Sequence, residues 1–126
     1  MTALKVGIVT KEWPPAIYGG AGVHVLQLTQ ALRTINDVHV DVHCFGGPRD
    51  DAFGYSLPSG FADANPAVQA LAIDLEMATH LGHVDVVHSH TWYANMAGHL
   101  AALQHDIGRF SRTCKGLRRR RVSTDH

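Results

Sequence analysis

The chain has 126 residues and no net charge, with 45% hydrophobic and 17% charged residues, so it suits one folded domain and leaves no room for a two-domain enzyme. It has two widely separated cysteines, no run of about 18 apolar residues, and no signal-peptide pattern after the first methionine. These features argue against a disulfide scaffold and favour a cytoplasmic protein.

The first half of the chain shows hydrophobic periodicities typical of alternating strands and helices. Residues 5–10 are rich in β-branched side chains and predict a first buried strand. The glycine-rich segment 19–22 leads into residues 23–35, whose apolar positions recur at spacings of three and four and predict an amphipathic helix. Strict alternation predicts a second strand over residues 38–45, and we expect residues 46–64 to be irregular.

The second half continues this alternation. Asn65 and Pro66 have the types preferred at the start of a helix, which we expect to end near Gly82. Residues 84–89 predict a third strand, and residues 92–104 predict a helix of small residues able to pack closely on a sheet. The order predicts an α/β fold: a Rossmann-like parallel sheet with flanking helices and right-handed crossovers.

The composition changes abruptly after residue 107, where the pattern calls for a fourth strand. Residues 108–126 hold seven of the 11 Lys and Arg residues and one acidic residue, whereas residues 1–107 hold ten acidic residues and nine of the ten histidines. We therefore predict a domain over residues 1–107. Residues 108–126 are predicted to be a basic tail, disordered or aberrant, of the kind that a shift of reading frame produces.

The glycines at the start of the first helix are candidates for binding an anion. Gly19, Gly20 and Gly22 let the backbone approach a ligand, and the amides of a helix N-terminus attract a phosphate or diphosphate. The alternative is a tight turn with no ligand. Neither the dinucleotide fingerprint GxGxxG nor a P-loop lysine is present.

Two histidines, His88 and His90, stand at the carboxyl end of the third predicted strand, on one side of it. No third ligand follows at a recognisable spacing, so a hydrogen bond to a polar ligand is favoured over a metal site. Trp92 and Tyr93 are candidates to wall a sugar or base, or to pack the helix.

The arginine run Arg118–Arg121 has the composition of a nucleic-acid contact, although basic tails are more often solvated. The remaining histidines of residues 1–107 show no pattern that points to a site, and we expect them at the surface or satisfied in the core: His24, His39, His43, His80, His83, His99 and His105.

Two long motifs carry a resemblance to a known family. Glu12-Trp-Pro-Pro-Ala-Ile-Tyr-Gly-Gly-Ala-Gly-Val-His-Val25 and Val86-Val-His-Ser-His-Thr-Trp-Tyr-Ala-Asn-Met-Ala-Gly-His-Leu-Ala101 closely resemble the N-terminal lobe of bacterial glycogen synthases of the family 4 glycosyltransferase type. The likeness covers roughly residues 4–107. It implies a GT-B architecture of two Rossmann-like lobes, of which this chain holds an incomplete first, acceptor-side lobe.

The resemblance also implies an activity. Such enzymes transfer glucose from ADP-glucose or UDP-glucose, with retention, to an α-1,4-glucan or a small sugar phosphate, and need no metal or cofactor. It implies that Gly19, Gly20 and Gly22 form the donor diphosphate loop, that His90 hydrogen-bonds the transferred sugar, and that His88 supports it. Because the second lobe is missing, we expect the chain to be inactive alone.

Two alternatives to a transferase lobe stay open. One is a non-catalytic module that binds a phosphate or sugar through the glycine loop, and the other is a nucleic-acid binder that uses the basic tail. No membrane partner is expected, and the sequence predicts no oligomeric state.

Overall fold

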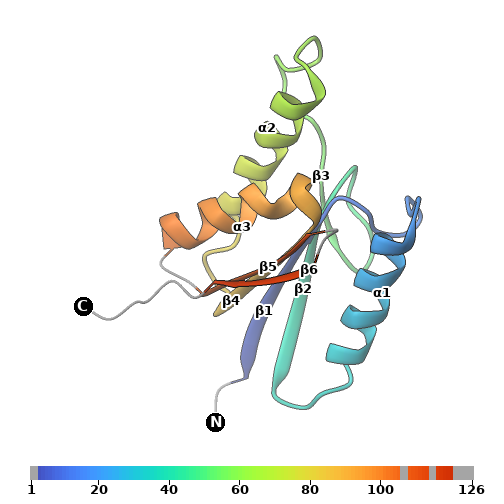
Figure 1. The fold of residues 1–126 in the computed structure, drawn as a ribbon, viewed down its shortest axis with the longest axis vertical. Helices are drawn as coiled ribbons and strands as arrows, with labels where there is room; N and C mark the ends of the chain where they lie inside the picture. The colour runs from blue at the N-terminus through green and yellow to red at the C-terminus, as the bar shows by residue number, and fades with distance from the viewer. Residues whose placement is uncertain (1–2, 106–107, 114–115, 121–126) are drawn as a thin grey trace.

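The computed structural model describes residues 3–105, 108–113 and 116–120. Within these ranges a six-stranded sheet has the order β3-β2-β1-β4-β5-β6, with three helices beside it (Figure 1). The elements follow the chain as β1 Leu4–Thr10, α1 Gly20–Leu32, β2 Val38–Phe45, β3 Phe53–Tyr55, α2 Pro66–Thr79, β4 Val86–His90, α3 Thr91–His105, β5 Gly108–Thr113 and β6 Gly116–Arg120.

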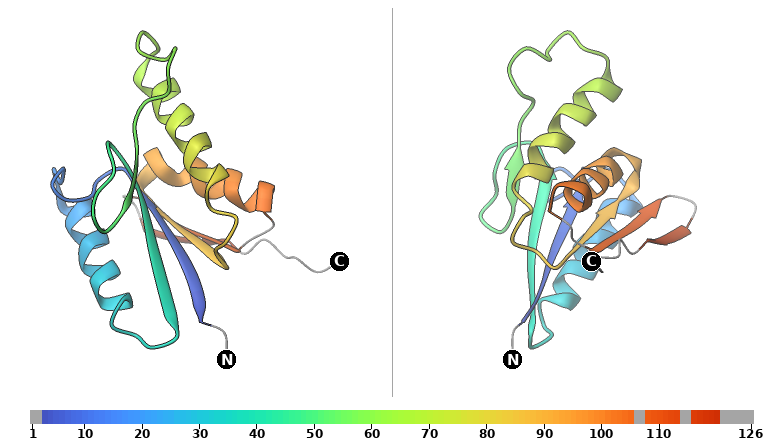
Figure 2. Two further views of the ribbon diagram at one scale, coloured as in Figure 1. Left: turned by 180° about the vertical axis from the view of Figure 1, so that it is seen from behind. Right: turned by 90° about the vertical axis from the view of Figure 1, so that its left-hand side faces the viewer.

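The sheet is parallel from β3 to β5, and β6 runs antiparallel to β5. Helix α1 covers one face, and α2 and α3 lie together on the other (Figures 1 and 2). The predicted Rossmann-like parallel sheet with flanking helices is confirmed. Because the strands are parallel, their carboxyl ends meet at one rim, where such folds bind ligands.

The hydrophobic core has two parts, one on each face of the sheet, and alternate residues of β1 contribute to each. Val9 packs with Met77 and Ala97 beneath α2 and α3. Ile8 packs with Val25 and other apolar residues beneath α1. The predicted close approach of the small-residue helix is confirmed, since five small residues of α3 are buried: Ala94, Ala97, Gly98, Ala101 and Ala102.

Helix α1 begins three residues before the predicted start, so the glycine cluster lies in its first turn and not ahead of it. Gly19 is the N-cap residue, with an extended backbone. Gly22 is buried against Glu12 and Ile17, where a Cβ would come within about 3 Å of both side chains. Tertiary packing here outweighs the low helix propensity of glycine.

Two further elements agree with or refine the prediction. The side chain of Asn65 accepts a hydrogen bond from the amide of Val68 at 3.0 Å, so the predicted N-cap of α2 is confirmed. The segment 46–64, predicted to be irregular, contains the three-residue strand β3, which pairs with the end of β2. Three residues are too few to show a period of two.

The segment after residue 107 differs from the expected disordered tail. Residues 108–113 form β5, which pairs in parallel with β4, and residues 116–120 form β6. Strand pairing uses backbone groups that every residue here possesses, so an edge such as that of β4 can be extended by a sequence without a core-strand composition. Residues 121–126, which include the last residue of the arginine run, lie outside the described ranges.

Candidate functional site

The rim at the carboxyl ends of β1 and β4 brings the predicted site residues together. These two strands are neighbours in the sheet, and α1 follows β1 while α3 follows β4 directly. The ring of His24, in the second turn of α1, lies 6.1 Å from the ring of His90 at the end of β4. The glycine loop and His90, 70 residues apart in the sequence, therefore share one rim of the sheet.

The loop that enters α1 is held by a carboxylate. Oε1 of Glu12 accepts hydrogen bonds from the amides of Tyr18, at 2.5 Å, and Gly19, at 3.1 Å. The amide of Gly19 is thus committed to a side chain of the same loop. The amides of residues 20–22 come before the first intrahelical hydrogen bond of α1 and carry the positive end of its dipole.

The three predicted glycines have different surroundings. A Cβ at Gly19 or Gly20 would meet nothing within 4 Å, whereas Gly22 has no room for one. Gly22 is therefore required by packing against Glu12. Gly19 and Gly20 leave open space at the helix N-terminus, as a close backbone approach to a ligand requires.

His88 and His90 lie side by side, as the alternation of the strand predicts, with ring centroids 4.2 Å apart. His90 is only 3% exposed. Between them Ser89 is fully buried on the other side of the strand, where its hydroxyl donates to Asn95 at 3.0 Å. Thr91, which follows at the turn into α3, has a left-handed backbone with φ of 66°.

Aromatic rings stand at the start of α3. The rings of Trp92 and Tyr93 are 3.9 Å apart, and the ammonium of Lys11 lies 3.9 Å from the centroid of the Tyr93 ring. Trp92 is 54% exposed, so it does not pack the helix onto the core. The rim thus presents an exposed aromatic side chain beside a cation.

Lys11, Glu12 and His24 were not among the predicted site residues. Lys11 and Glu12 follow the last residue of β1, and that position at a strand's carboxyl end was the signal that could have found them. His24 lies one helical turn after Gly20, on the same side of α1. A single histidine in a helix has no sequence pattern that would predict a site.

The rim offers groups of three chemical kinds. The amides at the start of α1 and the ammonium of Lys11 favour an anion such as a phosphate. The imidazoles can hydrogen-bond hydroxyls, and the exposed aromatic ring can contact the apolar face of a sugar or base. Across the residues that the structure describes, no group of three or more His, Cys, Asp or Glu side chains is arranged to hold a metal ion.

Comparison with known proteins decides the family. The sequence profile of Glycosyltransferase Family 4 matches residues 18–126. The chain belongs to this glycosyltransferase family. The match to the family profile continues to residue 126, so it includes the basic segment 108–126.

Its curated relatives include the alpha-maltose-1-phosphate synthase of Mycobacterium tuberculosis, 49% identical over 104 residues, and that of Mycolicibacterium smegmatis, 46% identical over 104 residues. In each case the alignment covers 82% of this chain and 26% of the relative, so the family 4 chain spans about a quarter of the length of these proteins.

A solved structure supports the fold alone. The UDP-GlcNAc 2-epimerase from Methanocaldococcus jannaschii superposes with a TM-score of 0.58 at 16% sequence identity, covering 86% of this family 4 chain and 31% of the epimerase chain. Within the described residues, no helix has the length and apolar character needed to cross a membrane.

Proposed function

We propose that this chain is part of the acceptor-side lobe of a glycosyltransferase that moves glucose from ADP-glucose or UDP-glucose to a small sugar phosphate, and that it is inactive alone. Its family membership and its relatives' name, alpha-maltose-1-phosphate synthase, support this acceptor. Maltose 1-phosphate consists of two glucose units and one phosphate, so its synthesis by glucosyl transfer takes glucose 1-phosphate as acceptor. An α-1,4-glucan, as in glycogen synthases, is the alternative acceptor.

The observation that carries the proposal is the shared rim of the glycine loop and His90. A diphosphate at the N-terminus of α1 would meet the amides of residues 20–22, which offset the charge that develops as the nucleoside diphosphate departs. The imidazole of His90 would hydrogen-bond a hydroxyl of the transferred sugar and orient it.

Binding to the 126-residue chain tests this proposal. ADP-glucose, which carries the sugar to be transferred, is titrated by calorimetry into wild type, His90→Ala, and His99→Ala as the matched control, because His99 is exposed on α3. Loss of one hydrogen bond, worth about 1 kcal/mol, is expected to weaken binding roughly fivefold in His90→Ala and not in His99→Ala. Circular dichroism checks that both variants fold.

Other outcomes favour the other functions. Equal binding by wild type and His90→Ala contradicts the assignment of His90. Duplex DNA titrated at two salt concentrations covers the nucleic-acid alternative. Salt-sensitive DNA binding that disappears when residues 108–126 are deleted, without ADP-glucose binding, would contradict the transferase proposal.

A further inference from the structure

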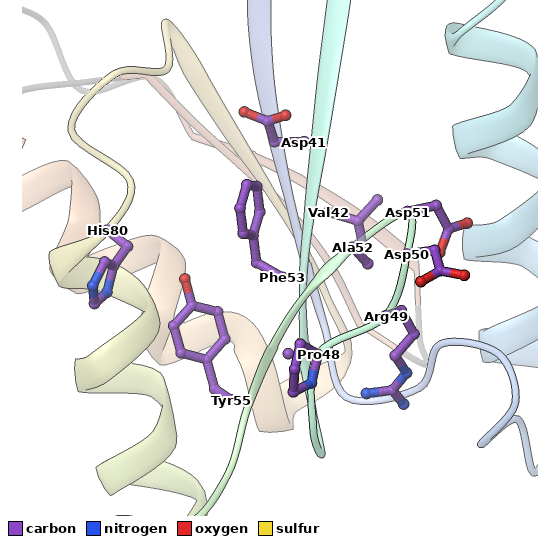
Figure 3. Close-up of a pocket in the computed structure, with 11 residues that line it drawn as sticks. Asp41, Val42, Pro48, Arg49, Asp50, Asp51, Ala52, Phe53, Tyr55 and His80 are labelled. Atoms are coloured by element: carbon purple, nitrogen blue, oxygen red, sulfur yellow. The ribbon is translucent and has the colours of Figure 1, made fainter.

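A pocket lies at the β2–β3 edge of the sheet, separated from β4 by β1. It has a volume of about 520 Å³, which falls within the roughly 300–1,000 Å³ of ligand pockets in proteins. Figure 3 shows the rings of Phe53, Tyr55 and His80 on the same side of β3, with the carboxylate of Asp41 beyond Phe53.

Stacked rings form the apolar wall of this pocket. The buried ring of His43 lies 5.0 Å from Phe53 and 5.7 Å from Tyr55, nearly parallel to both. Burial lowers the pKa of His43 to about 4, so the ring is neutral at pH 7. Phe53 is 54% exposed and presents an aromatic surface to the pocket. Such a surface fits the apolar face of a ring-shaped ligand.

Oriented acceptors complete the pocket. The two carboxylate oxygens of Asp41 contact Nε2 of His39, at 3.1 Å, and Nε2 of His83, at 2.8 Å. Burial alone would raise the pKa of Asp41, but the hydrogen bond from His83 and the nearby imidazoles together lower it, so Asp41 is ionised at pH 7. Each fixed oxygen keeps capacity to accept from a ligand hydroxyl.

Two more side chains add hydrogen-bonding positions. Nδ1 of His80 lies 2.9 Å from the carbonyl of Glu76, so Nδ1 carries a hydrogen and donates it there, which leaves Nε2 to hydrogen-bond a ligand. The hydroxyl of Tyr55 contacts Nδ1 of His43 at 2.7 Å and keeps at least one further position, since a hydroxyl can make up to three hydrogen bonds.

The charges of the pocket disfavour an anionic ligand. Its lining includes three carboxylates, those of Asp41, Asp50 and Asp51. Its guanidinium, that of Arg49, donates to the main-chain carbonyls of four residues and is committed to holding the surrounding loops: Trp13, Pro14, Phe45 and Gly47. A neutral ligand rich in hydroxyls satisfies the acceptors without charge repulsion.

We propose that this pocket binds a neutral saccharide, with one sugar ring on Phe53 and its hydroxyls on Asp41 and His80. The inference is independent of the proposed transfer reaction, because no residue of the β4 rim takes part. Four of the histidines that showed no pattern in the sequence thus fall into one cluster, which the pairing of β2 with β3 and the chain after α2 bring together: His39, His43, His80 and His83.

Saturation-transfer NMR with maltotriose tests the proposal on the 126-residue chain. The parent protein for this test is His90→Ala, which lacks the rim histidine, and the Phe53 variants are made in it. Phe53→Leu in that background keeps an apolar strand residue but removes the ring face, and should weaken maltotriose binding roughly three- to tenfold, the value of about 0.5–1.5 kcal/mol for an aromatic contact. Phe53→Tyr keeps the ring and should bind as the parent does.

Three results would overturn the proposal. These are no saturation transfer to maltotriose in the parent, equal transfer in Phe53→Leu, and binding of a diamine probe that maltotriose does not displace. The last result would identify a cation site. Weaker binding of ADP-glucose by His90→Ala concerns the rim only, so failure of one proposal is distinguishable from failure of the other.

Discussion

Asp74 is a carboxyl group buried inside the fold. It lies on α2 and is 2% exposed, and its Oδ1 has no hydrogen-bond partner among the described residues. Burial raises the pKa of Asp74 from 3.8 to about 8, because the ionised form loses its hydration. The folded protein therefore holds a proton on this group at neutral pH that the unfolded chain releases.

This difference predicts how stability depends on pH. Between pH 3.8 and 8 the folded state binds more protons at Asp74, so its contribution is fully present below pH 3.8 and is lost as the pH rises through 8. His43 acts in the opposite sense, but only below pH 6.5, because its pKa is lowered to about 4. The slope from pH 6.5 to 8 thus reports Asp74.

We expect the free energy of unfolding to fall by up to about 2 kcal/mol between pH 6.5 and 8, at no more than about 1.4 kcal/mol per pH unit. Asp74→Asn, which is neutral at every pH and similar in shape, should remove this slope. Urea titrations followed by circular dichroism measure both proteins. A wild-type curve that is flat over this interval would show that Asp74 is ionised in the folded state.

The junction between β4 and α3 depends on a strained backbone. Thr91 has φ of 66°, and its hydroxyl is buried without a partner among the described residues. A left-handed conformation costs an L-residue roughly 1–2 kcal/mol, and a β-branched side chain suits it least. The turn nevertheless lets α3 start directly after His90, with no intervening loop.

Thr91→Gly should therefore stabilise the protein by about 1 kcal/mol, because the relief of strain exceeds the extra entropy of glycine in the unfolded chain. Asp37→Gly is the matched control, since Asp37 has a similar φ of 68° but a side chain that tolerates it. Urea midpoints compare the two variants. If Thr91→Gly destabilises the protein and Asp37→Gly does not, the side chain of Thr91 stabilises this junction.

At the scale of elements, sequence patterns predicted those helices and strands that depend on interactions between neighbouring residues. Alternation in residues 38–45 and the capping pair at Asn65 gave β2 and the start of α2 because each depends on near neighbours. The start of α1 could not be predicted this way. It depends on the packing of Gly22 against Glu12, a contact between residues ten apart that a scan for periodicity does not detect.

The sites show the same division. His90 and the glycine loop could be placed on one rim because parallel strands share their carboxyl ends. Glu12 as the partner of the Gly19 amide could not be foreseen, since its role depends on the path of the intervening loop. The proposed saccharide pocket combines residues of β2, the loop before β3, β3 and the turn after α2, and no spacing in the sequence relates them.

For the whole molecule, the edge at β2 is protected against pairing with another chain. Strand β3 is only three residues long, and in the described part of the chain no other strand pairs with the first part of β2 on that side. A guanidinium nitrogen of Arg33 donates to the carbonyls of Val40, at 3.2 Å, and Asp51, at 3.1 Å. Arg33 thus occupies a pairing position on the edge and links it to the loop before β3.

Helix α2 exposes apolar side chains on its surface. Val68, Leu71 and Leu75 recur at spacings of three and four, and they are 39%, 47% and 50% exposed. Together they form an apolar stripe on a helix that extends beyond the sheet in Figures 1 and 2. Exposed apolar stripes of this kind promote association between chains.

We therefore predict that the 126-residue chain self-associates and that Leu71→Gln with Leu75→Gln reduces this association, because glutamine keeps the helix propensity while removing apolar surface. Sedimentation velocity over a tenfold concentration range measures the change in average mass. Val23→Gln on α1 is the control, since Val23 is similarly exposed, at 43%, but outside the stripe. An equal effect of Val23→Gln, or concentration-independent monomers in wild type, would contradict a role for α2 in association.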